Sequence, residues 1–463
     1  MRKITLSSVT LALALSLPLA LSGQPALAKG YDVAALRDAA LHGDTVAWDV
    51  VEGITTEVGP RQAASPREAM ARAWAVKKLK SLGFANVHIE DYMMPGWVRG
   101  VETGSVTGPF AQPLHLTALG NSGATPAEGI EAEVVYFPTI ADLIAAPDGS
   151  LKGKIAFIDH AMHATQDGSS YGVFGAARRQ GPTVAATKGA IAVVIRSIGT
   201  DEHRVPHTGV TMWADGVTPI AAAALSNPDA DLLARIFERG KPVTMQLTLT
   251  PRFVGQQPSG NVIAEVPGSD PKAGIIMITG HLDSWDLGTG AIDDGAGVAI
   301  VTAAAKAIMD AGKPKRTIRI LLAGAEEVGS FGGKAYYEAH KGERHVLTLE
   351  SDFGADRVWR ADFRLPDAAK DVRAAMVAAL APLGVPAGDA PAGGGADNAE
   401  FVKTGVAVID LQQSGLRYFD IHHTADDTLD KIDLDQLRQN VAAWISVLAV
   451  AADAPDIFDA VAK

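Results

Sequence analysis

The order of apolar and polar positions divides the chain into stretches with different periods. From Val33 to Leu82 apolar residues recur with the spacing of a helix, most clearly over 67–80. Pro66 suits the first turn of that helix, and Gly83 lies just past its end. The alternation over 87–92 then indicates a strand. The first stretch is therefore predicted to be mainly helical.

The middle of the chain follows a different pattern. Between about Leu114 and Arg252 short apolar runs are separated by glycine and proline, which is typical of strands. The clearest runs are 131–137, 154–158, 190–195 and 243–249. Short helical pieces lie between them, such as 229–239. This pattern predicts a separate, small β-rich domain.

Beyond a break at Gln256 to Gly260, strands of the buried type alternate with longer helices. The expected strands are 274–279, 317–322, 345–349 and 406–411. The expected helices are 294–311, 332–341, 368–383 and 434–452. Regular alternation of strand and helix predicts an α/β fold with a largely parallel sheet.

The first thirty residues have the pattern of an export signal. Arg2 and Lys3 precede an apolar run from Val9 to Leu21, which is interrupted at Pro18. This run is shorter than the ~20 residues that a bilayer-spanning helix requires. We therefore expect cleavage near Ala28 and a secreted or periplasmic protein. No later stretch is apolar enough to predict an integral membrane segment.

Composition narrows the classes of function. The chain has 463 residues, 47% of them apolar, which is enough for more than one domain. Lys and Arg total 41 against 53 Asp and Glu, and the net charge of -12 repels phosphate backbones, so we expect no nucleic-acid partner. Cysteine is absent. Any metal site must therefore use histidine and carboxylate ligands.

Residues with metal-binding and acid–base chemistry follow the apolar runs of the last stretch. They are His281 and Asp283 after 274–279, Glu326 and Glu327 after 317–322, Asp352 after 345–349, and His422 and His423 after 406–411. A glycine-rich segment, 288–297, adds Asp293. Because ligands bind beyond the carboxyl ends of strands in open α/β sheets, we expect these side chains to meet.

This set of residues meets the requirements of two divalent cations. Two such ions about 3.5 to 4 Å apart need one shared anionic oxygen and further nitrogen or oxygen donors on their outer sides. We assign Asp293 as the shared ligand. The outer ligands are His281 and Asp352 on one ion, and Glu327 and His423 on the other. Glu326 is then free to accept and return the proton of the attacking water.

Two further carboxylates receive supporting roles. Asp283 lies two residues after His281 and is placed to orient its imidazole by accepting the other ring N–H. Asp397 lies in the glycine-rich run 393–398, which either lines the substrate pocket or is a plain flexible loop.

The runs that contain these residues are His281-Leu-Asp-Ser-Trp285, Ala291-Ile-Asp-Asp-Gly-Ala-Gly297, Ala325-Glu-Glu327, Glu350-Ser-Asp352 and His423-Thr-Ala-Asp-Asp-Thr428, with Gly59-Pro-Arg61 near the start. Together they resemble the zinc aminopeptidase and carboxypeptidase Q family of co-catalytic metallopeptidases. The resemblance implies a three-layer α/β/α fold whose catalytic parts, 29–115 and 255–463, are separated by an inserted protease-associated domain, 116–254. It also implies a non-proline cis peptide between Asp293 and Asp294.

The same resemblance implies an exopeptidase with two Zn²⁺ ions per chain, which hydrolyses dipeptides or short peptides from the amino or the carboxyl end. A non-catalytic binding module and a single-zinc acyltransferase of the glutaminyl cyclase type are alternatives on the same fold. The spacing of His-Thr-x-x-Asp-Thr favours His423 over His422 as the ligand. Side-chain preference and oligomeric state, including a homodimer, are left open.

Overall fold

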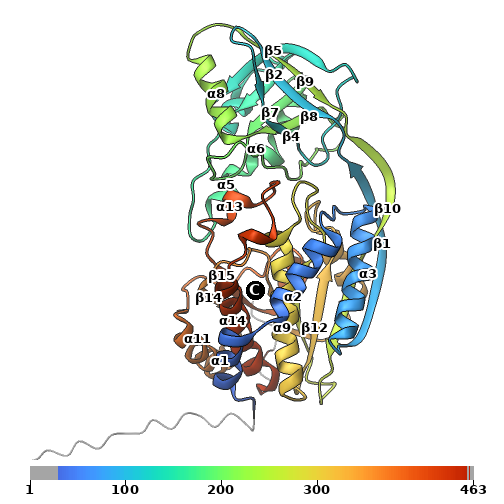
Figure 1. The fold of residues 1–463 in the computed structure, drawn as a ribbon, viewed down its shortest axis with the longest axis vertical. Helices are drawn as coiled ribbons and strands as arrows, with labels where there is room; N and C mark the ends of the chain where they lie inside the picture. Colours follow the sequence, from blue (N-terminus) through green and yellow to red (C-terminus); the bar gives the residue numbers. More distant parts are fainter. Residues whose placement is uncertain (1–29, 456–457, 459–463) are drawn as a thin grey trace, which may run out of the picture.

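The computed structural model describes residues 30–455 and residue 458, so the expected signal segment, 1–28, lies outside the described residues. Within the described part of the chain the strands form two sheets, of seven and eight strands. Each sheet with its helices forms one body, and a long pair of strands joins the two bodies (Figure 1). No helix of the described ranges is both long and apolar enough to cross a bilayer.

The first body begins with the helices that the sequence predicts. They are α1 (Val33–Gly43), α2 (Val46–Gly53) with a π-turn at Ile54–Val58, and α3 (Pro66–Ser81). Ser65 is the N-cap of α3, and its side chain accepts a hydrogen bond from the backbone N–H of Glu68. Pro66 follows in the first turn. Gly83 adopts a φ of 91° just after its end. The prediction of a helix over 67–80 is confirmed.

The sheet of the first body has the order β1-β10-β12-β11-β13-β15-β14. Its strands are β1 (Ala85–Val98), β10 (Arg252–Val266), β11 (Ile275–His281), β12 (Thr317–Ala323), β13 (His345–Glu350), β14 (Val358–Arg364) and β15 (Ala407–Gln413). Only the central strands β12, β11, β13 and β15 pair in parallel, and β1, β10 and β14 run antiparallel to their neighbours. The sheet is therefore mixed, and the prediction of a largely parallel sheet holds only for its centre.

Helices pack against both faces of this sheet, because alternate residues of each strand point to opposite sides. One core contains Ile276 and Ile278 of β11 together with residues of α1, α2, α9 (Ala296–Ala311), α11 (Lys370–Leu380) and α14 (Leu434–Asp453). A smaller core on the other face contains Met277 with residues of α10 (Phe331–His340) and α12 (Ala399–Lys403). Burial from both sides explains the continuous apolar runs of the central strands.

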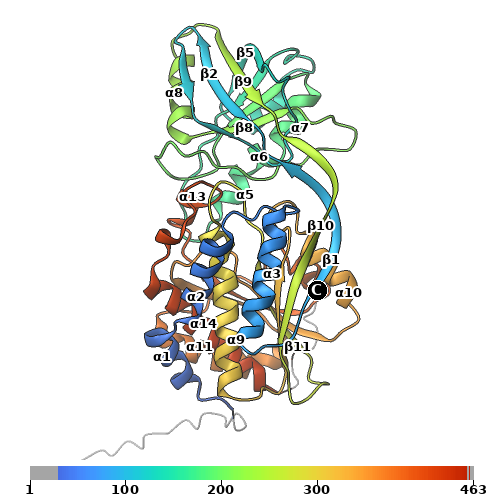
Figure 2. The same cartoon turned by 45° about the vertical axis from the view of Figure 1, so that its right-hand side comes forward.

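Strands β1 and β10 form the connection between the bodies. They pair antiparallel from Ala85 opposite Glu265 to Val98 opposite Arg252. The predicted break at Gln256 to Gly260 is wrong, since β10 continues through it. This stretch of β10 has β1 as its one partner, so the missing N–H of Pro258 removes no bond from a second neighbour. Figure 2 shows both strands bending together from one body into the other.

The sheet of the second body has the order β3-β2-β9-β5-β6-β7-β8-β4. Its strands are β2 (Glu102–Gly108), β3 (Gln112–Leu114), β4 (Leu116–Ala118), β5 (Ile130–Phe137), β6 (Ile155–Ile158), β7 (Ala192–Arg196), β8 (Ala221–Leu225) and β9 (Val243–Leu249). The helices of this body are α4 (Ile140–Ala145), α5 (Ser170–Phe174), α6 (Ala176–Arg179), α7 (Gly181–Thr187) and α8 (Asn227–Phe237). The sheet therefore draws on residues 102–249 and includes two strands that precede position 116.

Candidate active site

The carboxyl ends of the central parallel strands carry the residues that the sequence singles out. His281 is the last residue of β11, Glu326 and Glu327 lie in the turn after β12, and Asp352 lies two residues after β13. Asp293 lies in the π-turn Ala291–Gly295, before α9. The peptide bond between Asp293 and Asp294 is cis, as the family resemblance implies. His423 follows the short helix α13 (Tyr418–Ile421).

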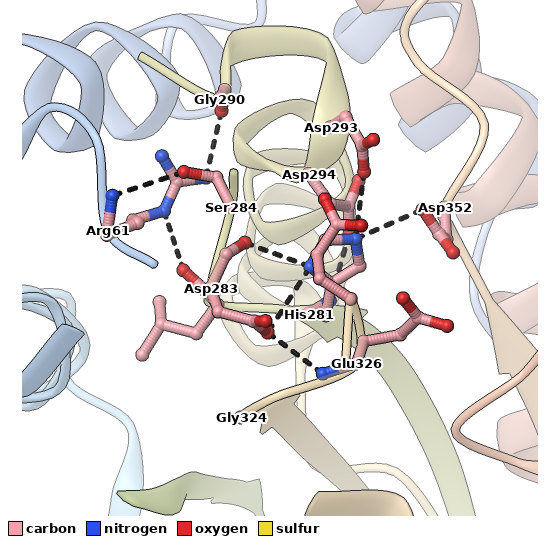
Figure 3. Close-up of polar contacts among 12 residues, drawn as sticks. Arg61, His281, Asp283, Ser284, Gly290, Asp293, Asp294, Gly324, Glu326 and Asp352 are labelled. Atoms are coloured by element: carbon pink, nitrogen blue, oxygen red, sulfur yellow. Dashed lines mark hydrogen bonds and ion pairs between the residues drawn. The ribbon is translucent and has the colours of Figure 1, made fainter. Parts of the chain in front are cut away.

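The structure brings the predicted metal ligands together, with Asp293 at the centre. Its Oδ1 atom lies 3.0 Å from Nε2 of His281, and its Oδ2 atom lies 3.3 Å from Nε2 of His423. The other two carboxylates lie on the outer sides. Asp352 Oδ1 is 3.2 Å from Nε2 of His281, and Glu327 Oε2 is 2.9 Å from Nε2 of His423. The two oxygens of Asp293 thus face different histidines, as a shared ligand requires. Figure 3 shows the side that contains His281 and Asp352.

The cluster has the chemistry of a cation site. Asp293, Glu327, His281 and His423 are all buried. Oδ2 of Asp293 and Oε1 of Glu327 accept no hydrogen bond. Buried carboxylate oxygens without donors are costly unless a positive charge is near. Because imidazole and carboxylate are also the ligands that zinc accepts, these residues fit a zinc site.

Charge interactions within the cluster shift its pKa values strongly. Burial alone would lower the pKa of His281, but the carboxylates of Asp352, Asp283 and Asp293 outweigh it and raise that pKa well above its ordinary value. Burial alone would raise the pKa of Asp293, but the hydrogen bond from His281 and the close imidazole of His423 hold it well below its ordinary value. The carboxylates thus favour the protonated form of His281, and a bound metal ion would compete with that proton.

The two consecutive histidines, His422 and His423, differ in their contacts with the carboxylates of the cluster. The rings of His422 and His423 stack with centroids 3.5 Å apart. Nε2 of His422 is 3.5 Å from Oδ2 of Asp293, whereas His423 approaches both Asp293 and Glu327. Nδ1 of His423 lies 3.2 Å from the main-chain oxygen of Thr208, which is the outer partner that a ligand histidine needs. This geometry favours His423 as the ligand.

The turn after β12 separates the two adjacent glutamates. Ala325 has a φ of 57°, and beyond it Glu327 approaches His423 while Glu326 lines the cleft beside the cluster. Burial, followed by the nearby carboxylates of Asp352 and Asp397, raises the pKa of Glu326 well above its ordinary value. A raised pKa makes a carboxylate a stronger base, which suits a group that accepts and returns a proton.

The expected role of Asp283 needs a correction. The atom nearest to Nδ1 of His281 is the main-chain oxygen of Asp283, at 2.9 Å, whereas the carboxylate is 3.6 Å away and beyond hydrogen-bond distance. Oδ1 of Asp283 instead accepts the backbone N–H of Glu326 at 3.0 Å. Asp283 therefore orients the imidazole through its main chain and fixes the glutamate turn through its side chain (Figure 3).

The cluster opens into a cleft of about 290 Å³ between the two bodies. The first body contributes the carboxylates Asp293, Glu326, Glu327 and Asp352 and both histidines, and the second body contributes Tyr171, Arg178, Arg179 and Val210. Asp397 is not among the lining residues and is only 3% exposed, and both of its carboxylate oxygens lack a hydrogen bond. A larger cavity of about 410 Å³ lies in the second body and contains none of the predicted site residues.

A buried arginine, which the sequence suggests only through the Gly59-Pro-Arg61 run, holds the loop between His281 and Asp293. The guanidinium of Arg61 donates to the main-chain oxygens of Leu282 at 2.6 Å, Thr289 at 2.6 Å and Gly290 at 2.8 Å. Arg61 is fully buried. It therefore fixes the backbone just after His281 and shortly before Asp293.

Replacement of Arg61 by methionine is expected to destabilise the protein by at least about 3 kcal/mol, because each buried acceptor left without a donor costs about 1 to 3 kcal/mol. The measurement is the midpoint of urea unfolding. Lys77→Met removes the same charge from the exposed face of α3 and is the matched control. An unchanged midpoint for Arg61→Met would show that the loop does not depend on this side chain.

Comparisons with known proteins place the chain among peptidases. The model described as Peptidase family M28 matches residues 261–448, the segment that contains all the predicted ligands. Carboxypeptidase Q from Bos taurus is 34% identical over 400 residues, which cover 86% of this chain and 83% of that protein. A peptidase M28 precursor from Shewanella amazonensis has a TM-score of 0.87 and 48% identity, over 90% of this chain and 96% of that chain. A zinc aminopeptidase from Bacillus subtilis shares the fold, with a TM-score of 0.61 and 20% identity over 89% of this chain and 98% of that chain.

These relatives show that the protein is a peptidase, and its buried histidines and carboxylates form groups that could hold a metal ion. The protein is therefore an enzyme, and the alternative of a non-catalytic binding module is set aside. The chain belongs to peptidase family M28.

Proposed function

We propose that the protein is a secreted or periplasmic exopeptidase that binds two zinc ions and removes the terminal residue of dipeptides or short peptides. The observation that carries this proposal is the placement of Asp293, whose two carboxylate oxygens face His281 and His423 separately. The relatives named above include both a carboxypeptidase and an aminopeptidase.

The proposed roles follow the geometry of the cluster. Asp293 would be shared, His281 and Asp352 would complete one zinc site, and Glu327 and His423 the other. Bound zinc supplies a Lewis acid for the scissile carbonyl and lowers the pKa of water towards neutrality. Glu326 accepts the proton of the attacking water and returns it to the departing amine. Asp283 holds the glutamate turn, and the buried Asp397 helps to raise the pKa of Glu326 without lining the cleft.

We further propose that the first body is the three-layer catalytic domain and that the second body is a protease-associated domain inserted into it. The chain enters and leaves the second body through the paired strands β1 and β10, which supports an insertion. Because the second sheet includes β2, which begins at Glu102, we change the proposed start of the insert from 116 to about residue 102. Export and cleavage near Ala28 remain part of the proposal, and amino-terminal sequencing of the mature protein tests them.

Removal and return of metal tests the function directly. We expect the purified protein to contain two zinc ions per chain, to hydrolyse alanyl-alanine, to lose that activity in a chelator and to regain it when zinc is added. Metal content is measured by elemental analysis, and hydrolysis by release of free alanine. A single bound zinc together with cyclisation of an amino-terminal glutamine would instead identify the acyltransferase alternative.

A further inference from the structure

Two consecutive arginines of the second body reach the cleft. Arg178 and Arg179 lie at the end of α6, on the side of the second body that faces the first (Figure 1). Arg178 is only 3% exposed, and its Nη1 atom lies 3.3 Å from Nδ1 of His423. Its Nη1 donates to the main-chain oxygen of Thr208 and its Nη2 to the hydroxyl of Tyr171. Arg178 is thus held beside the metal cluster by neutral groups.

These arginines differ from Arg196 of the same body and from Arg99 at its junction in lacking an anionic partner. Arg196 pairs with Asp159 and Asp231, and Arg99 pairs with Asp286 and Glu102. Within the described residues no carboxylate lies within ion-pair distance of Arg178 or Arg179. The buried Nε atom of Arg178 has no hydrogen-bond acceptor, and Arg179 donates only to the main-chain oxygen of Gly172. The guanidinium of Arg179 therefore keeps free donors for an anion that enters the cleft, and Arg178 adds an uncompensated positive charge beside it.

The distribution of charge in the cleft also indicates that the arginines would bind an anion. Its carboxylates, Asp293, Glu326, Glu327 and Asp352, lie on the first body and would be balanced by two divalent cations. The two guanidinium groups would then be the remaining net charge. Burial, and next the charge of Arg178, lowers the pKa of Arg179, as expected for two like charges that no anion separates. An anionic group of a ligand would relieve this repulsion.

We propose that Arg178 and Arg179, with the hydroxyl of Tyr171, form the receptor for the free α-carboxylate of the peptide substrate. This inference rests on the exopeptidase function proposed above and assigns it to the carboxyl end. Three covalent bonds of about 1.3 to 1.5 Å separate a scissile carbonyl carbon from the carboxylate of the next residue. Both arginines line the same cleft as Asp293, Glu326 and His423, so a receptor there is within reach of a substrate that ends one residue after the scissile bond. A planar guanidinium group can donate two parallel hydrogen bonds to the two oxygens of a carboxylate.

The test compares alanyl-alanine with its carboxyl amide and its N-acetyl form, using the zinc-loaded full-length enzyme. We expect the wild-type protein to prefer the free acid over the amide in kcat/KM and to accept the N-acetyl form. Replacement of Arg179 by glutamine should reduce that acid-over-amide preference by about 10- to 100-fold, the range of one hydrogen bond to a charged group. Arg179→Lys should restore part of it, because lysine keeps the charge but loses the planar fork.

Arg239→Gln is the matched control, because it removes the same charge from an exposed position after α8. It should leave the preference unchanged, and the thermal unfolding midpoint of each variant verifies that it is folded. Equal cleavage of acid and amide by the wild type, or an equal loss for both substrates in Arg179→Gln, would overturn the receptor. Loss of cleavage on N-acetylation alone would place the recognition at the amino end. If the zinc-loaded wild type hydrolyses none of these peptides, the exopeptidase function itself fails.

Discussion

Replacement of Glu326 by glutamine is expected to lower kcat by about 10²- to 10⁴-fold, the contribution of a positioned general acid–base group. Glutamine keeps the shape of the side chain but can neither accept nor return the proton. Glu326 lines the cleft beside the cluster without being needed as one of the five proposed ligands. The zinc content should therefore stay the same while the rate of dipeptide hydrolysis falls.

Glu338→Gln, on the exposed face of α10, is the control for the loss of one carboxylate, and its rate should match the wild type. A Glu326→Gln protein with full zinc content and a normal rate would remove this residue from the proposed mechanism. A variant that loses zinc would instead make Glu326 a ligand, a role that its proximity to His281 and Asp352 permits geometrically.

Replacement of Asp293 by asparagine is expected to reduce bound zinc below two ions per chain and to lower kcat/KM by about 10³-fold. Asp293 is the residue through which the two halves of the cluster are connected, and an amide cannot supply two anionic oxygens. The loss corresponds to the several kcal/mol of charge stabilisation that metal ions contribute in such sites. Metal content and dipeptide hydrolysis are measured on the same sample.

Asp310→Asn is the matched control, because that carboxylate is exposed at the end of α9. It should retain both ions and the full rate. Two tightly bound zinc ions in Asp293→Asn would contradict the shared-ligand assignment and would leave the histidines and outer carboxylates as sufficient ligands.

The first body could be predicted largely from the sequence, because its helices and central strands are long and strongly periodic. The second body was harder, and β8 shows why. Four of its five residues are alanine, the residue with the highest helix propensity, yet the segment is a fully buried strand between β7 and β4. Tertiary pairing overrides local preference there. Strand β14 was missed because polar residues interrupt its pattern at the edge of the sheet.

The candidate ligands could be predicted because each follows a strand that ends at the same edge of the sheet. The arginines could not, since Arg178 and His423 lie 245 positions apart and belong to different bodies. Nothing in a pair of adjacent arginines indicates which loop it will face. The contact of Thr208 with His423 could not be predicted either, because it depends on how the second body packs against the first.

The pairing of β1 with β10 makes the second body modular. Val98 and Arg252 are cross-strand partners, so the points where the chain leaves and returns are already adjacent. A tight hairpin turn of a few residues could join them and leave the register of the ribbon intact. An enzyme shortened in this way would keep every proposed zinc ligand but would lose the two arginines and the support of His423. Gain or loss of the second body at this junction could therefore change which substrates are bound while the hydrolytic centre stays the same.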